Sequence, residues 1–372
     1  MKPDYTLHDT DSIYTPSLLF YKELIQNNIA RTLKIAKDPS RLRPHVKTHK
    51  TPQIVDMELE MGITKHKCAT IAEAEMLANC GVLDILIAYP MVGPNCHRIA
   101  NLIQKYPNIQ FAVLMDNPQA AKNLSAVMTQ AGQQVGVFVD INVGQDRTGI
   151  TPGDAAADLY KLLEELPSLE VRGLQVYDGH NHQTDFGERA SAVNAQLAPV
   201  LEFRERLVRQ GHSVPTIVVG GTPTFPLYAE MEIPGLECSP GTCILHDHGY
   251  GERFPDMSGF VPAAIVLTRV ISKPRQNRLT LDLGHKAIAA DPPAGKRSKL
   301  INVPEYQTLL QNEEHMVIET SAADQFQIGS EIYAIPTHIC PTCNIHQQAY
   351  VIENGKVVDQ WEIAGRDRVL TV

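Results

Sequence analysis

The sequence predicts an α/β protein in which a TIM-type (β/α)8 barrel is followed by a C-terminal all-β domain. Between residues 43 and 239, eight short apolar runs alternate with longer amphipathic stretches, as in a barrel of parallel strands joined by helices. The runs do not alternate cleanly between apolar and polar residues, which is typical of parallel strands buried on both faces. After about residue 255, strand patterns follow one another without helices between them.

The expected elements of the barrel can be placed along the chain. Its helices include residues 71–78, 155–166 and 191–210, and the last of these ends before Gly211, a residue type that favours helix ends. A doubly wound open sheet is the main alternative, but no G-x-G-x-x-G motif follows the first strand. The eight expected strands are residues 43–47, 63–68, 84–89, 110–115, 135–142, 170–177, 216–220 and 236–239.

The all-β domain is expected from five further strand patterns, at residues 263–271, 278–283, 315–319, 331–335 and 348–353. Asn354-Gly355 is a strong hairpin signal, so residues 351–363 are expected to form a strand, a tight turn and another strand. We therefore expect the barrel at residues 15–255 and the β domain at residues 256–372. Residues 1–14 are expected to pack with the β domain.

Composition excludes several classes of partner and location. Lys and Arg total 33 and Asp and Glu total 42, with no block rich in basic residues, so neither a nucleic acid nor an anionic membrane is an expected partner. The first residues lack the apolar segment of a secretory signal, and no apolar run is long enough to span a bilayer. An odd number of cysteines, seven, does not indicate a disulfide framework in a chain of this length. A cytoplasmic protein with reduced thiols is expected.

Lys47 is the first candidate for chemistry. It lies in the sequence RPHVKTHK, at the carboxyl end of the first expected strand, and the carboxyl ends of barrel strands form the catalytic face of such folds. A lysine there can bond covalently to a carbonyl compound or to pyridoxal phosphate when burial or cationic neighbours lower its pKa. The alternative is a solvated basic turn.

Two glycine-rich loops follow the last two expected strands. Gly221 and Thr222 lie after the seventh strand, and Gly241 and Thr242 lie after the eighth. Loops at these positions commonly bind phosphate in such barrels, because glycines let backbone N–H groups approach an anion. The alternative is a pair of ordinary turns.

Further polar residues follow the fifth and sixth expected strands. Arg147 lies in DRTG, where its guanidinium can face a pyridine nitrogen. Tyr177 lies in YDGHNH, where its hydroxyl can bind a phosphate or phenolic oxygen, and His180 and His182 of the same segment can act as bases. Each of these residues, taken alone, is more typical of a surface loop.

The segment from His338 to His346 carries four possible zinc ligands within nine residues. A closed zinc finger normally takes its ligand pairs from two separated segments, so this reading is disfavoured. His338 and Cys340, two positions apart, are expected to lie on one side of an extended segment and to leave coordination positions open for water or substrate, as in a catalytic metal site. Buried thiols and a structural histidine are the alternative.

These motifs together resemble the D-threonine aldolase / D-serine dehydratase family, in the alanine-racemase-like class of fold-type III pyridoxal-phosphate enzymes. The resemblance is carried by TPSLLFYKELIQNNI, RPHVKTHK, KCATIAEAEML, DRTGI, YDGH, GGTPTFP, ECSPGTC and the late H-x-C. It extends from Thr15 to the last hairpin, with the motifs in the expected order. It implies a barrel plus a β domain, usually assembled as a homodimer.

The resemblance also implies roles for individual residues. Lys47 is implied to bind pyridoxal 5'-phosphate covalently, with Arg147 near the ring, and His338 and Cys340 are implied to hold a divalent metal (zinc, manganese or magnesium). In the better-known aldolases an aspartate often stands where this chain has Cys340, whereas a cysteine resembles zinc-dependent D-serine dehydratases. Thiolate favours zinc over the harder ions. Phosphate contacts are implied for Tyr177, Gly221, Thr222, Gly241 and Thr242.

The implied activity is cleavage of small D-β-hydroxy-α-amino acids, with D-threonine giving glycine and acetaldehyde. In that reaction His180 or His182 is the expected base for the β-hydroxyl proton. The main alternative is D-serine dehydratase, which yields pyruvate and ammonia and in which Lys47 removes the α-proton. An amino-acid racemase and a non-catalytic pyridoxal-phosphate carrier are the remaining alternatives.

Overall fold

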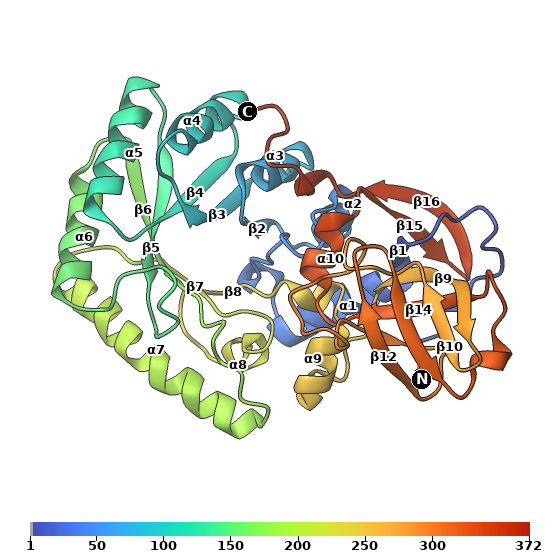
Figure 1. The fold of residues 1–372 in the computed structure, drawn as a ribbon. Helices are drawn as coiled ribbons and strands as arrows, with labels where there is room; N and C mark the ends of the chain where they lie inside the picture. Colours follow the sequence, from blue (N-terminus) through green and yellow to red (C-terminus); the bar gives the residue numbers. More distant parts are fainter. Residues whose placement is uncertain (1–2) are drawn as a thin grey trace. The chain divides into compact units, whose positions relative to one another are not determined.

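The computed structural model describes residues 3–372, which divide into two compact units (Figure 1). Leu33–Lys47, Val55–Gly241 and Asp367–Val372 form the first, which we call the barrel unit. The other described residues form the second, which we call the β unit. Segments of the two units alternate along the chain, whereas the sequence predicted a single boundary near residue 255.

The barrel unit is built on a parallel sheet with the strand order β2-β3-β4-β5-β6-β7-β8. Every neighbouring pair in this order is parallel. The strands lie within one or two residues of seven of the eight ranges expected from the sequence. Their bounds are β2 Lys65–Cys68, β3 Asp84–Pro90, β4 Gln110–Met115, β5 Val135–Ile141, β6 Leu169–Val176, β7 Thr216–Val219 and β8 Leu236–Cys238.

Residues 42–46 close this sheet into a barrel. On one side the Arg43 N–H donates to the Cys238 carbonyl of β8 at 2.9 Å, and on the other the Val46 N–H donates to the Lys67 carbonyl of β2 at 2.9 Å. Parallel bridges join Leu42 with Cys238 and His45 with Lys67. The eighth expected strand is therefore present as a short bridging segment, and the predicted (β/α)8 class is confirmed.

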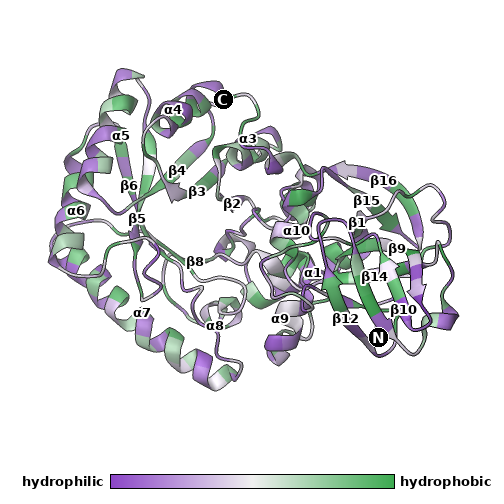
Figure 2. Cartoon of the chain, viewed as in Figure 1, coloured by the Kyte–Doolittle hydropathy of each residue, from purple (hydrophilic) through white to green (hydrophobic). Residues whose placement is uncertain are grey.

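Helices connect successive strands, and α4–α7 lie on the outside of the barrel strands (Figure 1). Hydrophobic and hydrophilic residues alternate along α5–α7, as expected of helices with one buried face (Figure 2). The helix α7 begins five residues before the predicted start, because the Asp185 side chain accepts from the Glu188 N–H and so caps the helix. The bounds are α3 Ile71–Asn79, α4 Asn95–Lys105, α5 Pro118–Gln130, α6 Asp154–Glu165, α7 Phe186–Arg209 and α8 Phe225–Ala229.

The β unit contains a larger sheet with the order β12-β13-β10-β9-β1-β15-β16, and β14 pairs with both β9 and β11. Asn354 and Gly355 adopt positive φ angles of 49° and 70° in the β15–β16 turn, which confirms the predicted hairpin. The bounds are β1 Ser17–Tyr21, β9 Ala264–Arg275, β10 Arg278–Leu281, β11 Ser298–Leu300, β12 Tyr306–Gln311, β13 Met316–Thr320, β14 Glu331–Pro336, β15 Gln348–Glu353 and β16 Lys356–Glu362.

Besides its sheet, the β unit holds the short helices α9 (His248–Arg253) and α10 (Ile339–Ile345). Two other helices, α1 (Lys22–Ala36) and α2 (Pro52–Glu60), cross the boundary between the units along the chain. The strand β1 pairs with β9 and β15, so the chain enters the sheet of the β unit before it reaches the barrel.

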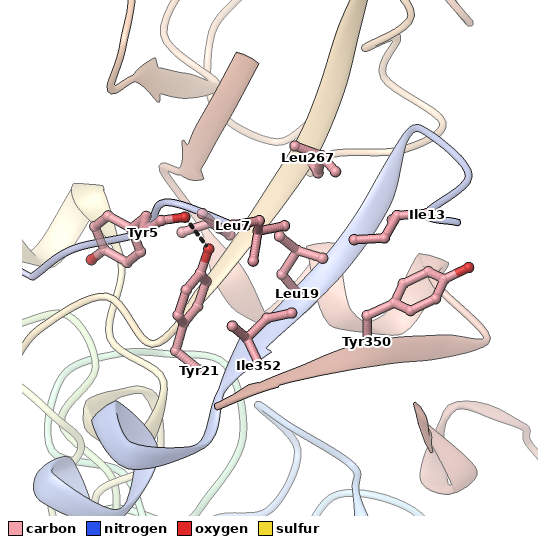
Figure 3. Packing of buried hydrophobic residues seen from close by; sticks show 9 residues of the cluster. Tyr5, Leu7, Ile13, Leu19, Tyr21, Leu267, Tyr350 and Ile352 are labelled. Carbon is pink, nitrogen blue, oxygen red and sulfur yellow. Dashed lines mark hydrogen bonds between the residues drawn. The ribbon is translucent and has the colours of Figure 1, made fainter. Parts of the chain in front are cut away.

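The N-terminal segment packs on this sheet (Figure 3). Tyr5, Leu7 and Ile13 are buried in one hydrophobic cluster with residues of β1, β9 and β15. The Tyr21 hydroxyl donates to the Tyr5 carbonyl at 2.7 Å, which holds the segment against β1.

Two general properties of the described residues bear on function. None of their helices is both long enough and apolar enough to cross a membrane. All seven cysteines of the chain lie among them and are free thiols.

We expect Gly173→Ala to destabilise the barrel unit more than an ordinary glycine substitution. Gly173 in β6 has a φ of +136°, and a Cβ there would lie 1.9 Å from the Thr216 carbonyl oxygen of β7. The clash with backbone should lower the free energy of unfolding by about 3 kcal/mol or more. Gly81→Ala is the matched control, because Gly81 also has a positive φ (+81°) but no atom within 4 Å of the added Cβ.

Urea denaturation followed by circular dichroism measures both variants. Gly81→Ala should lose only about 1 kcal/mol, the cost of the left-handed backbone. Equal losses for the two variants would show that the close approach of β6 and β7 is absent.

Candidate functional site

Lys47 follows directly after the segment that closes the barrel. It is half-buried, and its backbone N–H donates to His45 Nδ1 at 3.3 Å. His45 is bridged to Lys67 of β2, so the barrel-closing hydrogen bonds determine where the Lys47 backbone lies. The sequence predicted that Lys47 lies at the carboxyl end of the first barrel strand, and this position agrees with that prediction.

Three cations surround the ring of Tyr177. The Arg147 guanidinium carbon lies 4.7 Å from the ring centroid, and the Nζ atoms of Lys47 and Lys67 lie 6.0 Å and 5.9 Å from it. Lys47 directly follows the closing segment, Lys67 lies in β2, and Arg147 and Tyr177 lie in the loops after β5 and β6. The barrel thus brings Lys47, Arg147 and Tyr177 together.

Lys67 was not predicted. It is only 3% exposed, and its Nζ donates to Gln175 Oε1 at 3.4 Å. Burial lowers the pKa of Lys67 to about 7, and the nearby charge of Lys47 acts in the same direction. The sequence signal that could have indicated Lys67 was its position near the carboxyl end of an expected buried strand.

The loop that carries Arg147 is held by two carboxylates. The Thr148 hydroxyl donates to Asp140 Oδ2 at 2.8 Å, and the Gly149 N–H donates to Asp116 Oδ2 at 2.8 Å. Burial raises the pKa of Asp140. These bonds fix the turn that presents the Arg147 guanidinium to Tyr177.

The glycine-rich loops lie close to Tyr177 and to each other. The Gly241 N–H donates to the Thr222 hydroxyl at 3.1 Å, which joins the loop after β8 to the loop after β7. A Cβ at Gly221 would lie 3.3 Å from a ring carbon of Tyr177, and a Cβ at Gly179 would lie 2.3 Å from the Tyr177 hydroxyl oxygen. Glycine at both positions therefore leaves room for the tyrosine.

Asp178 ties the loop after β6 to the loop after β7. It is buried, and it accepts hydrogen bonds from the side chains of Thr224 (2.9 Å), Tyr228 (3.0 Å) and Gln196 (2.9 Å). The Thr224 hydroxyl oxygen in turn accepts from the Gly221 N–H at 3.2 Å. Sequence reasoning gave Asp178 no role, because its partners lie up to 50 residues away.

The two candidate histidines differ in environment. His180 is half-buried and its Nε2 would lie 3.5 Å from a Cβ at Gly144, in the loop after β5. Its Nδ1 is buried without a hydrogen-bond partner among the described residues. His182 is exposed. His180 is therefore the one that faces the loops of the barrel.

The H-x-C segment does not have the expected extended geometry. His338 has extended backbone (φ −134°, ψ 105°) at the N-cap of α10, and Cys340 lies in the first turn of that helix. Pro341 follows in the same turn, where proline needs no hydrogen-bonded N–H. That proline was the missed signal for a helix start.

His338 and Cys340 nevertheless lie close together within the β unit. Burial alone would lower the pKa of His338, but hydrogen bonds and charge interactions with Cys340 and Asp291 raise it to about 9. The Nδ1 atom of His338 lies 2.5 Å from Asp291 Oδ2, which leaves Nε2 for a metal. The Cys340 sulfur lies 3.2 Å from the Thr48 hydroxyl and 3.6 Å from the Thr242 hydroxyl.

Asp247, which lies 92 residues before Ile339 in the sequence, positions the H-x-C segment. One carboxylate oxygen accepts from the N–H of Ile339, between the two candidate ligands, at 3.1 Å. The other accepts from the Tyr250 N–H at 2.9 Å and caps α9. Burial raises the pKa of Asp247 to about 6.

The other two possible zinc ligands of this segment have different surroundings. Cys343 is buried, and burial raises its pKa well above the usual value. His346 Nε2 lies 2.8 Å from the Ala287 carbonyl. Within residues 3–372, no group of three or more His, Cys, Asp or Glu side chains is arranged to hold a metal. The imidazole of His338 and the thiol of Cys340 fit an open site completed by other ligands.

The barrel unit fits pyridoxal phosphate by its charge and its hydrogen-bond donors. Its cation cluster suits an anionic ring compound, Lys47 offers an amine, and the linked glycine loops offer N–H and hydroxyl donors. Thr242, the last predicted phosphate contact, begins the next segment of the β unit.

Comparison with known proteins assigns the chain to a family. Residues 22–247 match the model of the alanine racemase N-terminal domain, and residues 263–352 match a putative serine dehydratase domain. The D-threonine aldolase of an Arthrobacter species is 31% identical over 330 residues, which cover 87% of this chain and 85% of that protein. The 3-hydroxy-D-aspartate aldolase of Paracoccus denitrificans (strain Pd 1222) is 27% identical over 97% of this chain and 94% of its own length.

A solved structure gives the same result for the fold. The crystal structure of D-threonine aldolase from Filomicrobium marinum superposes with a TM-score of 0.89 and 26% identity, covering 98% of this chain and 99% of that one. The chain therefore belongs to the alanine-racemase-like family of pyridoxal-phosphate enzymes, which includes D-threonine aldolases and D-serine dehydratases.

Proposed function

We propose that this chain is a pyridoxal-phosphate- and divalent-metal-dependent lyase that cleaves D-β-hydroxy-α-amino acids, with D-threonine converted to glycine and acetaldehyde. The observation that carries the proposal is the placement of Lys47 beside Arg147 and Tyr177 in the barrel unit. The similarity to D-threonine aldolase over most of both chains supports the aldolase reaction. A homodimer in the cytoplasm remains our expectation from the sequence.

In this proposal the barrel residues hold the cofactor. Lys47 would hold it through its amine. The donors of the Gly221–Thr222 and Gly241–Thr242 loops and the Tyr177 hydroxyl would bind its phosphate, and Arg147 would lie near its ring. When bound, pyridoxal phosphate withdraws electrons from the bond that breaks at Cα. The Arg147 guanidinium would disfavour protonation of a ring nitrogen next to it, because two adjacent positive charges repel.

The metal site is proposed at His338 and Cys340. The Asp291 carboxylate fixes the ring orientation of His338, and Asp247 fixes the backbone between the two ligands. A thiolate ligand favours zinc over manganese or magnesium. A metal ion there supplies a Lewis acid for the β-hydroxyl group of the substrate.

Proton transfer is assigned to histidine and lysine side chains. In the aldolase reaction we propose His180 as the residue that accepts the β-hydroxyl proton, because it faces the barrel loops whereas His182 is exposed. In a dehydratase, Lys47 instead removes the proton from Cα.

D-serine dehydratase is the second candidate function. It is favoured by the match of residues 263–352 to a serine dehydratase domain and by the cysteine at the second ligand position. Racemase and carrier functions have less support, because neither requires the His338–Cys340 pair.

Product analysis tests the proposal. Purified protein supplied with pyridoxal phosphate and zinc or manganese should release glycine and acetaldehyde from D-threonine and should leave L-threonine intact. Chromatography of the amino acid and an aldehyde assay measure the outcome. Pyruvate and ammonia from D-serine, without cleavage of D-threonine, would establish the dehydratase instead. No lyase product from either D-amino acid would contradict the proposal.

Metal removal tests the role of the H-x-C pair. Dialysis against a chelator should abolish turnover while the absorption of bound cofactor stays, and zinc should restore activity. Cys340→Ala should lower kcat by more than about tenfold, because it removes a metal ligand. Cys343→Ala is the matched control, because Cys343 is a buried thiol of the same helix. The Cys343→Ala protein should keep its metal content.

Elemental analysis reports the metal bound to each variant. Full turnover by protein with no detectable metal would contradict an open catalytic metal site.

A further inference from the structure

Lys67 is a buried amine to which the proposed reaction gives no task. It lies in β2, its side chain is 3% exposed, and its Nζ donates to the neutral Gln175 side chain at 3.4 Å. Burying an ammonium group away from water is unfavourable unless nearby charge or a ligand compensates. A barrel strand that needed only packing would carry an apolar residue at this position.

The position of Lys67 is linked to that of Lys47. His45 is bridged to Lys67, and Lys47 follows two residues later on the same segment. The Nζ atoms of the two lysines lie 5.9 Å and 6.0 Å from the centroid of the same Tyr177 ring. The two amines therefore belong to neighbouring segments and share one aromatic neighbour.

The charged groups that act on Lys67 are predominantly positive. They come from the closing segment, β5 and the loop after β5, and they are Arg43, Lys47, Asp140 and Arg147. Asp140 is the carboxylate among them, and it also accepts a hydrogen bond from Thr148 and interacts with Asp116. The neighbouring side chains of β6 and its loop, Gln175 and Tyr177, bring no carboxylate to Lys67.

Two physical effects follow from this arrangement. Without a bound ligand, burial and repulsion by Lys47 lower the pKa of Lys67 to about 7, so it loses its charge as the pH rises through neutrality. A charged Lys67 also opposes a second positive charge beside it, because like charges repel. An unprotonated amine is the form that reacts with an aldehyde. An anionic ligand among these cations would in turn favour the charged form of Lys67.

We propose that Lys67 is a further residue of the cofactor site, a positioning residue whose positive charge lowers the proton affinity of the nitrogen by which Lys47 holds pyridoxal phosphate. This inference rests on the proposed function, since it requires the cofactor at Lys47. Lys67 acts through Lys47 rather than on the substrate.

The test is a pH titration of the bound cofactor in the holoenzyme. The absorption spectrum changes with protonation of the nitrogen that joins the cofactor to Lys47, and the midpoint is compared between variants. Lys67→Met removes the charge and keeps the length of the side chain, so its midpoint should rise by roughly one pH unit. Lys67→Arg keeps a charge at all pH values, so its midpoint should equal or fall below that of the wild type.

Lys65→Met is the matched control. Lys65 lies on the same strand, two residues before Lys67, but it is paired with Glu237. Its replacement should leave the midpoint within about 0.2 pH unit of the wild-type value, because its charge is already balanced.

The outcomes separate this inference from the proposed function. A Lys67→Met midpoint equal to that of the wild type, or a Lys67→Arg midpoint above it, would overturn the role of Lys67. If circular dichroism shows that Lys67→Met does not fold, the comparison of the Lys67→Arg midpoint with the wild-type midpoint decides the question alone. Wild-type protein that retains no pyridoxal phosphate after gel filtration would instead refute the proposed cofactor site.

Discussion

The hydrogen bonds that residues 42–46 make with β8 on one side and β2 on the other close the barrel, and the candidate site depends on them. They join two strands that lie at opposite ends of the sheet order. The same bonds set the register of His45 against Lys67 and so determine where Lys47 leaves the barrel. Without this closure, the lysine at the end of the segment would have no fixed relation to the loops after β5, β6, β7 and β8.

Closure also explains the electrostatic character of the site. It brings Lys47, Lys67 and Arg147 around one tyrosine, with Asp140 as a partly compensating carboxylate. Glycines at 179 and 221 leave the space that the Tyr177 side chain occupies. A site with surplus positive charge and backbone donors is suited to an anionic ring compound that carries a phosphate. Buried carboxylates at Asp178 and Asp247 hold the surrounding loops in each unit without contributing reactive groups.

Much of the fold follows from local sequence, because apolar runs and turn residues act over short distances. The runs at residues 110–115 and 135–142 match β4 and β5 closely, and the Asn354-Gly355 turn has the expected positive φ angles. The strand β12 was missed because its exposed and half-buried residues mix polar and apolar types without a clear period. The helix α10 was mistaken for an extended segment although Pro341 marked its first turn.

The supporting residues of the site were harder to predict, because they act through contacts distant in sequence. Asp291 and Asp247 reach the H-x-C segment across 47 and 92 residues. Lys67 belongs to a strand that was predicted correctly, but only the closed barrel shows that its side chain shares the surroundings of Lys47. Motifs therefore indicated the candidate site residues, whereas the groups that contact and orient them required the tertiary structure.

The central claim is that Lys47 is the amine that holds pyridoxal phosphate. Borohydride reduction of the cofactor-loaded protein, followed by proteolysis and mass spectrometry, identifies the lysine that bears the reduced pyridoxyl group. We predict a single modified residue, Lys47, with Lys67 and Lys50 unmodified and with no modification in Lys47→Ala. Labelling of Lys67 or another lysine in place of Lys47 would contradict the account.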